Sequence, residues 1–144
     1  MLKENVGHRG KTAEKEVELA LKQLNMSELF AYFRMPDARA AMGRLSASPA
    51  DFIYFSGDRS GFIEVKSTKH NFRLSRASFS QLPTLHKFGY AGASNILLVH
   101  HSELEVWRVI PPEALETDVT SWNLIAYKPW STAAQALLST GYFI

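Results

Sequence analysis

Two short apolar runs separated by four turn-forming residues constrain the fold of this chain more than any other feature. The runs are DFIYFS (51–56) and GFIEVK (61–66), and both are rich in aromatic and β-branched residues. The four residues between them, GDRS, are typical of a turn. The pattern therefore predicts two neighbouring antiparallel strands joined as a hairpin.

Three charged residues interrupt these otherwise apolar strands. Asp51 opens the first run, and Glu64 and Lys66 stand two apart near the end of the second. Side chains alternate between the faces of a strand, so Glu64 and Lys66 share a face. Charged groups are costly to bury unless they are paired or bind a metal. The hairpin therefore carries either a cross-strand ion pair at a sheet edge or a functional site.

The rest of the chain predicts an α/β (α+β) fold, in which a central mixed β-sheet is flanked by helices. Apolar residues at helical spacing predict an amphipathic helix over 11–25, with Thr12 as its N-cap and Glu14 at the edge of its buried stripe. We expect one domain over residues 1–144. Further elements are expected as a strand at 29–34, a loop at 35–50, a helix over 76–92, strands at 94–100, 104–110 and 123–128, and a helix at 131–140.

Composition excludes several classes of protein. The sequence has no cysteine, which excludes a disulfide framework and thiolate metal ligands. No apolar stretch approaches the roughly 20 residues of a membrane helix, and the polar N-terminus does not resemble a signal peptide. We expect an intracellular, cytoplasmic protein, in the host cytoplasm if it is viral, without a membrane partner or a small-molecule cofactor.

The net charge of +2 is unevenly distributed along the chain. Residues 31–90 hold nine basic and four acidic side chains, whereas residues 91–144 hold two basic and five acidic ones. The basic excess therefore surrounds the hairpin. A local positive field is what a polyanion-binding face needs, although lysine and arginine also solvate ordinary surfaces.

A register that places Asp51 opposite Glu64 would bring two carboxylates close together beside the ammonium of Lys66. Two such carboxylates repel unless a cation lies between them, and oxygen ligands suit Mg²⁺ or Mn²⁺. We therefore predict Asp51, Glu64 and the backbone carbonyl of Val65 as metal ligands. Glu14 is a further candidate ligand or water-positioning group, with Glu18 as its alternative. Lys66 would position or deprotonate a water, or stabilise charge developing at phosphorus.

Pro49, Asp51 and the Glu64-Val65-Lys66 tripeptide resemble the PD-(D/E)xK pattern of restriction-endonuclease-like nucleases, with one residue inserted between proline and aspartate. HRGKTAE (8–14), GFIEVKST (61–68), FRLS (72–75) and Gln81 further resemble RecU-type Holliday junction resolvases. The resemblance spans about residues 8–100 and implies catalytic roles for Glu14, Asp51, Glu64, Lys66 and Gln81.

The resemblance also implies a symmetric homodimer that cuts four-way DNA junctions with Mg²⁺. We expect a role in DNA recombination and repair. The expected DNA contacts are Arg9, Lys11, Arg34, Arg39, Arg44, Lys69, Arg73 and Arg76. Two alternatives stay open: another nuclease on the same scaffold, of a repair, restriction or replication type, and a junction- or DNA-binding module without catalysis.

Overall fold

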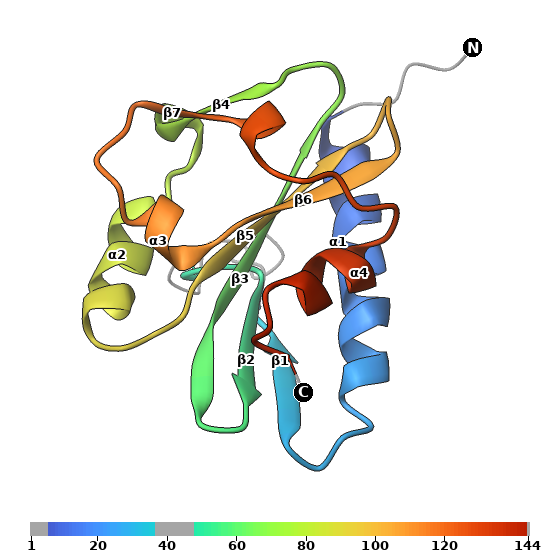
Figure 1. Cartoon of the computed structure of the whole chain (residues 1–144), viewed down its shortest axis with the longest axis vertical. Coiled ribbons are helices and arrows are strands. Elements are labelled where there is room, and N and C mark those ends of the chain that lie inside the picture. The colour runs from blue at the N-terminus through green and yellow to red at the C-terminus, as the bar shows by residue number, and fades with distance from the viewer. Residues whose placement is uncertain (1–5, 37–47, 144) are drawn as a thin grey trace.

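The structure, a computed structural model, describes residues 6–36 and 48–143, with side chains from residue 10 onward. Its elements follow one another along the chain as Figure 1 shows. They are α1 (Val6–Leu24), β1 (Phe30–Arg34), β2 (Phe52–Ser56), β3 (Arg59–Thr68), β4 (Arg73–Ser75), η1 (Arg76–Ser78), α2 (Leu82–Tyr90), β5 (Ile96–His101), β6 (Val106–Ile110), α3 (Pro112–Leu115), β7 (Ser121–Asn123), η2 (Leu124–Ala126) and α4 (Ala133–Ser139).

Five strands form a mixed sheet in the order β1-β2-β3-β5-β6, and β4 and β7 form a separate pair. β3 runs parallel to β5, whereas the other neighbouring strands of the main sheet are antiparallel. A parallel neighbour requires a crossover connection, which here includes β4, η1 and α2. The expected hairpin is present as β2 and β3, and β3 extends the second run at both ends to ten residues.

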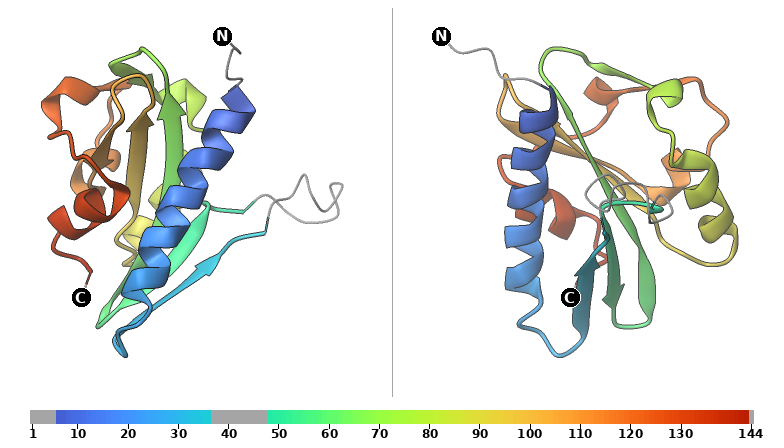
Figure 2. Two further views of the ribbon diagram at one scale, coloured as in Figure 1. Left: turned by 90° about the vertical axis from the view of Figure 1, so that its right-hand side faces the viewer. Right: turned by 180° about the vertical axis from the view of Figure 1, so that it is seen from behind.

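Helices cover both faces of the sheet (Figures 1 and 2). On one face, α1 and α4 pack through Val17, Leu21 and Leu137 against Phe52 and Trp107. On the other face, α2, α3 and the β4–β7 pair form a second apolar layer. Its buried members include Phe62, Phe79, Leu82, Leu97, Leu115 and Trp122. Alternate residues of each central strand therefore enter different layers, which fixes the face on which each charged residue stands.

Close packing between β3 and the start of β5 explains Gly61. A Cβ atom there would fall 2.1 Å from the backbone oxygen of Ser94. The same oxygen accepts a hydrogen bond of 2.7 Å from the hydroxyl of Tyr54. The strand that carries Glu64 and Lys66 is thus held against β5 by direct backbone approach.

Three expectations about the elements need correction. The first helix begins at Val6, so Thr12 lies inside the helix and is not its N-cap. The segment 123–128 is not a strand, because β7 ends at Asn123 and the Asn123 side chain accepts a hydrogen bond that begins a 3-10 turn. The helix expected over 76–92 is divided into η1 and α2. Part of the expected loop at 35–50 lies outside the described residues.

No helix in the described ranges is both long enough and apolar enough to cross a membrane.

Candidate active site

The register of the β2–β3 hairpin places Asp51 beside Glu64. Phe52 pairs with Ile63, so the residue before β2 faces the residue after Ile63. Asp51 and Glu64 also stand on the same face of the sheet as Phe62, because side chains alternate along each strand. The sequence predicted that the two carboxylates converge only if the register places Asp51 opposite Glu64, and the observed strand pairing has this register.

Asp51 is held in place by the strand opposite. Its Oδ2 atom accepts a hydrogen bond of 2.8 Å from the backbone N–H of Val65. Burial and a hydrogen bond shared with the Glu64 carboxyl raise the pKa of Asp51 to about 7. A hydrogen bond with Glu14 and the bond from Val65 act in the opposite direction. Three carboxyl groups therefore interact around Asp51, and one proton relieves the repulsion between them.

Glu64 is almost fully buried, with an exposed fraction of 3 %. Burial raises the pKa of its carboxyl, and the neighbouring Lys66 ammonium acts against that rise. Its Oε2 atom has no hydrogen-bond partner among the described residues. A buried carboxylate oxygen without a donor is unfavourable unless a cation binds it.

Lys66 stands two residues beyond Glu64 on the same face of β3. Its ammonium nitrogen lies 5.3 Å from the ring centroid of Phe79, which is within the range of a cation–π contact. Phe79 is buried just ahead of α2 and therefore limits where the ammonium can move. Sequence reasoning missed Phe79, since no local pattern links an aromatic residue to a lysine thirteen positions earlier.

Glu14 reaches the site from α1. It interacts with both Asp51 and Glu64, and one of its oxygens lies 3.6 Å from a guanidinium nitrogen of Arg34. The other guanidinium nitrogen of Arg34 donates to Glu18 at 3.0 Å. Arg34 therefore contacts both acids of this helix face. Glu18, the alternative candidate to Glu14, has its described ion pair with Arg34.

Gln81 lies at the N-cap position of α2, where its side chain makes no capping bond. Its Oε1 atom accepts a hydrogen bond of 3.3 Å from the hydroxyl of Ser80. α2 begins close in sequence to Phe79, which contacts Lys66. The catalytic role expected for Gln81 stays a prediction.

The residues expected to contact DNA occupy different environments. Lys11 and Lys69 are exposed, whereas Arg73 donates to Ser121 at 2.9 Å. Arg76 donates to the carbonyls of Thr117 and Val119, so it also holds the loop before β7. Arg39, Arg44 and the side chain of Arg9 lie outside the described part of the chain.

Asn95 is a second residue that sequence reasoning missed. It is buried, and its side-chain oxygen accepts from the Phe62 N–H at 3.0 Å. Its amide nitrogen donates to the carbonyl of Leu85 at 2.8 Å. Asn95 thus connects β3, two residues before Glu64, to α2. An asparagine in front of a strand usually marks a turn, so its sequence position carried no signal of this bridge.

The carboxylate oxygens around Asp51 are the type of ligand that a hard divalent cation prefers. Two carboxyls with raised pKa values meet there, and a buried oxygen of Glu64 lacks a donor. Within the described ranges, however, no three histidine, aspartate or glutamate side chains converge as a complete ligand set. The arrangement therefore supplies a pair of carboxylates, with the third acid close by but engaged by Arg34.

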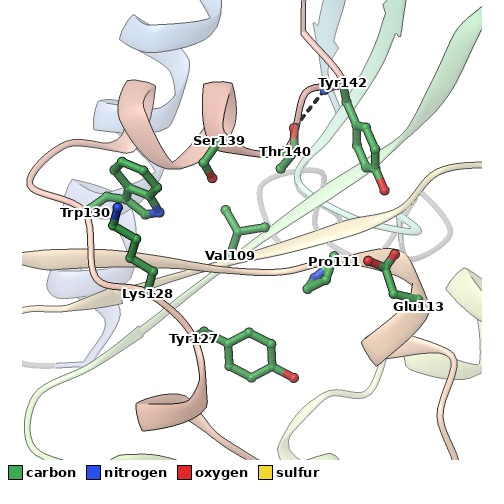
Figure 3. Close-up of a pocket in the computed structure, with 9 residues that line it drawn as sticks. All are labelled: Val109, Pro111, Glu113, Tyr127, Lys128, Trp130, Ser139, Thr140 and Tyr142. Carbon is green, nitrogen blue, oxygen red and sulfur yellow. Dashed lines mark hydrogen bonds between the residues drawn. The ribbon is translucent and has the colours of Figure 1, made fainter.

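A cavity of about 370 Å³ lies elsewhere on the molecule, between β6, α3 and the end of α4 (Figure 3). Val109 forms its floor, and Tyr127, Trp130 and Tyr142 surround it. Val109 packs against the α1–α4 layer, whereas Glu64 shares the face of Phe62. The cavity is thus on the other face of the sheet from Glu64, and none of the residues expected at the active site lines it.

The order of strands and the flanking helices give the mixed five-stranded α+β fold that the sequence predicted, and solved nuclease structures share this fold. The chain is similar in structure to Hjc, a Holliday junction resolvase of the archaeal hyperthermophile Archaeoglobus fulgidus. That similarity has a TM-score of 0.56 and 23 % identity, and it covers 88 % of this chain and 98 % of Hjc.

A bacterial homing endonuclease is also similar in structure, with a TM-score of 0.53 and 12 % identity over 97 % of this chain and 95 % of the other. The chain matches no family model, and no curated protein matches its sequence. At these identities the structural likeness shows the fold alone.

Proposed function

We propose that this protein is a divalent-metal-dependent endodeoxyribonuclease, and that its substrate is a four-way DNA junction. The observation that carries the proposal is the pair of interacting carboxyls, Asp51 and Glu64, beside Lys66 on a hairpin of this fold. Burial of two adjacent acids is unfavourable in the absence of a cation, and such arrangements are typical of functional sites.

Each residue has a distinct role in the proposed reaction. Asp51 and Glu64 would hold Mg²⁺ or Mn²⁺ through their carboxylate oxygens, with Glu14 and the carbonyl of Val65 as further ligands. The bound cation supplies Lewis-acid activation of a phosphate oxygen and of a water molecule. Lys66 orients that water or takes its proton, and its charge stabilises the negative charge that builds up on phosphorus.

The proposed reaction adds water across one phosphodiester bond. A bond forms between the water oxygen and phosphorus, and the bond from phosphorus to the 3′ oxygen breaks. The leaving oxygen gains a proton, so the products carry a 5′-phosphate and a 3′-hydroxyl. Lys11, Lys69 and Arg73, together with other basic residues around the hairpin, would hold the DNA backbone.

We favour the four-way junction as the substrate because the similarity to Hjc extends over 88 % of the chain and agrees with the sequence motifs. Such a junction has two strands to cut in symmetric positions. A two-fold homodimer would present one site to each of them.

The similarity to a homing endonuclease favours a second candidate, an endonuclease that cuts linear duplex DNA on the same scaffold. The incomplete ligand set keeps the non-catalytic binding module as a further alternative. In all three cases the basic surface would bind DNA, so cleavage rather than binding distinguishes them.

One experiment compares the three functions. A labelled synthetic four-way junction, a linear duplex and a flap of equal length are incubated with the protein and Mg²⁺ or Mn²⁺. We expect paired nicks in the junction and slow cleavage of the other two. Equal rates on the linear duplex would overturn junction selectivity, and binding without cleavage in either metal would establish the binding module.

A further inference from the structure

Arg34 contacts the helix that contributes the third acid of the site. It extends from the end of β1, and its side chain is 49 % exposed. Its two guanidinium nitrogens lie 3.6 Å from Glu14 and 3.0 Å from Glu18. Glu14 in turn interacts with Asp51 and Glu64. One cation therefore binds the acid that would complete the ligand set.

This contact places a positive charge on the third acid of the site. The hairpin places Asp51 and Glu64, and Glu14 interacts with Asp51, but among the described residues these acids do not form a complete ligand set. A guanidinium that holds Glu14 from the solvent side opposes a second cation on the same carboxylate, because the two positive charges repel each other. The Glu14 carboxylate therefore cannot interact at full strength with both the Arg34 guanidinium and a bound metal ion.

We propose that Arg34 is a substrate-released restraint on the third metal ligand. In the DNA-free protein Arg34 keeps Glu14 engaged, and metal binding is weak. A DNA phosphate competes for the exposed guanidinium, since arginine binds phosphate oxygens through charge-assisted hydrogen bonds. The negative charge of Glu14, which already lies beside Asp51, is then fully available to the metal. This inference rests on the proposed nuclease function and adds a positioning residue that links DNA binding to assembly of the site.

Glu18 gives the proposal an internal control. It contacts Arg34 at the shorter distance and shares the guanidinium charge with Glu14. Loss of Glu18 leaves Arg34 with Glu14 as its remaining acid in this group and strengthens the restraint. The two partners of Arg34 therefore have opposite expected effects on the availability of Glu14.

The test measures Mn²⁺ binding by isothermal titration calorimetry and needs no turnover. We expect Arg34→Ala to bind Mn²⁺ about tenfold more tightly than the wild type, and Glu18→Gln to bind it more weakly. Removal of a positive charge near any cation site has a general effect, so each change is repeated in an E14Q background. There the gain from R34A should fall below about twofold, because Arg34 acts through Glu14. Lys15→Ala, which removes an exposed charge from α1, is the matched control and should change affinity little.

A second arm adds a short duplex with non-hydrolysable linkages. This DNA should raise the Mn²⁺ affinity of the wild type towards that of R34A and should change R34A little. Arg34→Lys, which keeps the charge, should restore the weak metal binding of the DNA-free protein. An equal gain from R34A with and without Glu14, or no effect of the duplex on the wild type, would overturn the restraint while leaving the metal site intact. Absence of any Mn²⁺ binding that depends on Asp51 would overturn both this inference and the proposed function.

Discussion

The Oδ2 atom of Asp51 accepts a hydrogen bond of 2.8 Å from the backbone N–H of Val65, the residue between Glu64 and Lys66. This single bond fixes the acid of one strand against both charged residues of the next. It lowers the pKa of Asp51, but burial and the neighbouring Glu64 carboxyl still raise that pKa to about 7. The site is a property of the register between β2 and β3, and the following predictions depend on that register.

Neutral replacements in the hairpin should separate cleavage from binding. Asp51→Asn and Glu64→Gln keep the size of each side chain but remove the charge that a divalent cation requires, so we expect cleavage to fall at least about 100-fold. Lys66→Ala should cause a loss of similar size. Junction binding, measured by fluorescence anisotropy, should change only a few-fold. Retained cleavage in either acid variant would exclude that acid from the site.

The raised pKa of Asp51 predicts an unusual dependence of stability on pH. A group whose pKa is higher in the folded protein contributes stability below its unfolded value, near 4, and loses that contribution as pH rises through about 7. In EDTA, the free energy of unfolding should therefore fall by up to about 4 kcal/mol between pH 4 and 8. Urea unfolding of D51N should show a flatter profile and greater stability at pH 8. An identical decline in D51N would assign the effect to another group.

Divalent metal should reverse that decline, because the cation favours the ionised carboxyls that proton binding opposes. Mn²⁺ should raise the melting temperature of the wild type more at pH 8 than at pH 5. In D51N the increase should be much smaller at both values, as followed by circular dichroism. A rise of equal size at the two pH values would show that the metal acts away from these acids.

Asn95→Ala should destabilise the fold by about 2–3 kcal/mol, since it leaves the buried N–H of Phe62 and the carbonyl of Leu85 without their side-chain partners. Urea unfolding measures this loss. Serine at position 95 provides a comparison that keeps a small acceptor. A loss below about 0.5 kcal/mol in the alanine variant would show that the two backbone groups find other partners.

Lys69 and Arg76 should differ in their effects, because we expect one to affect DNA binding and the other to affect stability. Lys69 is exposed, so Lys69→Ala should weaken DNA binding and lower the slope of its salt dependence by about one, with little effect on stability. Arg76 donates to the carbonyls of Thr117 and Val119, so Arg76→Ala should lower stability by about 1–2 kcal/mol. The opposite pattern, with DNA binding dependent on Arg76 alone, would place the DNA on the β4–β7 side.

The central hairpin was predictable because strand alternation and a short turn leave few registers for its apolar residues, although the turn is Gly57 and Asp58 alone, since Arg59 and Ser60 belong to β3. Alternation also placed Glu64 and Lys66 on one face of the predicted strand. The first helix was less well bounded. Gly7 and Gly10 disfavour a helix, yet α1 includes both, and a Cβ on Gly10 would meet no atom within 4 Å.

Two of the remaining features depend on contacts between distant positions, and a third depends on a local turn. The indole N–H of Trp107 donates to Glu16 across 91 positions, although a helical wheel points Glu16 to solvent. The Arg34 guanidinium pairs with Glu14 and Glu18 of α1, whereas the sequence predicted a contact between Arg34 and DNA. At 123–128 a polar side chain determines the backbone, since Asn123 accepts from the Ile125 N–H and starts a 3-10 turn instead of a strand. The first two pairs have no local signature, whereas the Asn123 turn is local and reflects the preference of asparagine for turns.

The central claim is that Asp51 and Glu64 share a divalent cation. Crystals of the wild-type protein soaked in Mn²⁺ at pH 8 test it most directly, through anomalous difference density at the manganese edge. We expect a peak between the two carboxyls, within about 2.5 Å of an oxygen of each, and no peak in D51N crystals. Density elsewhere with none between Asp51 and Glu64, at a Mn²⁺ concentration that supports cleavage, would contradict it.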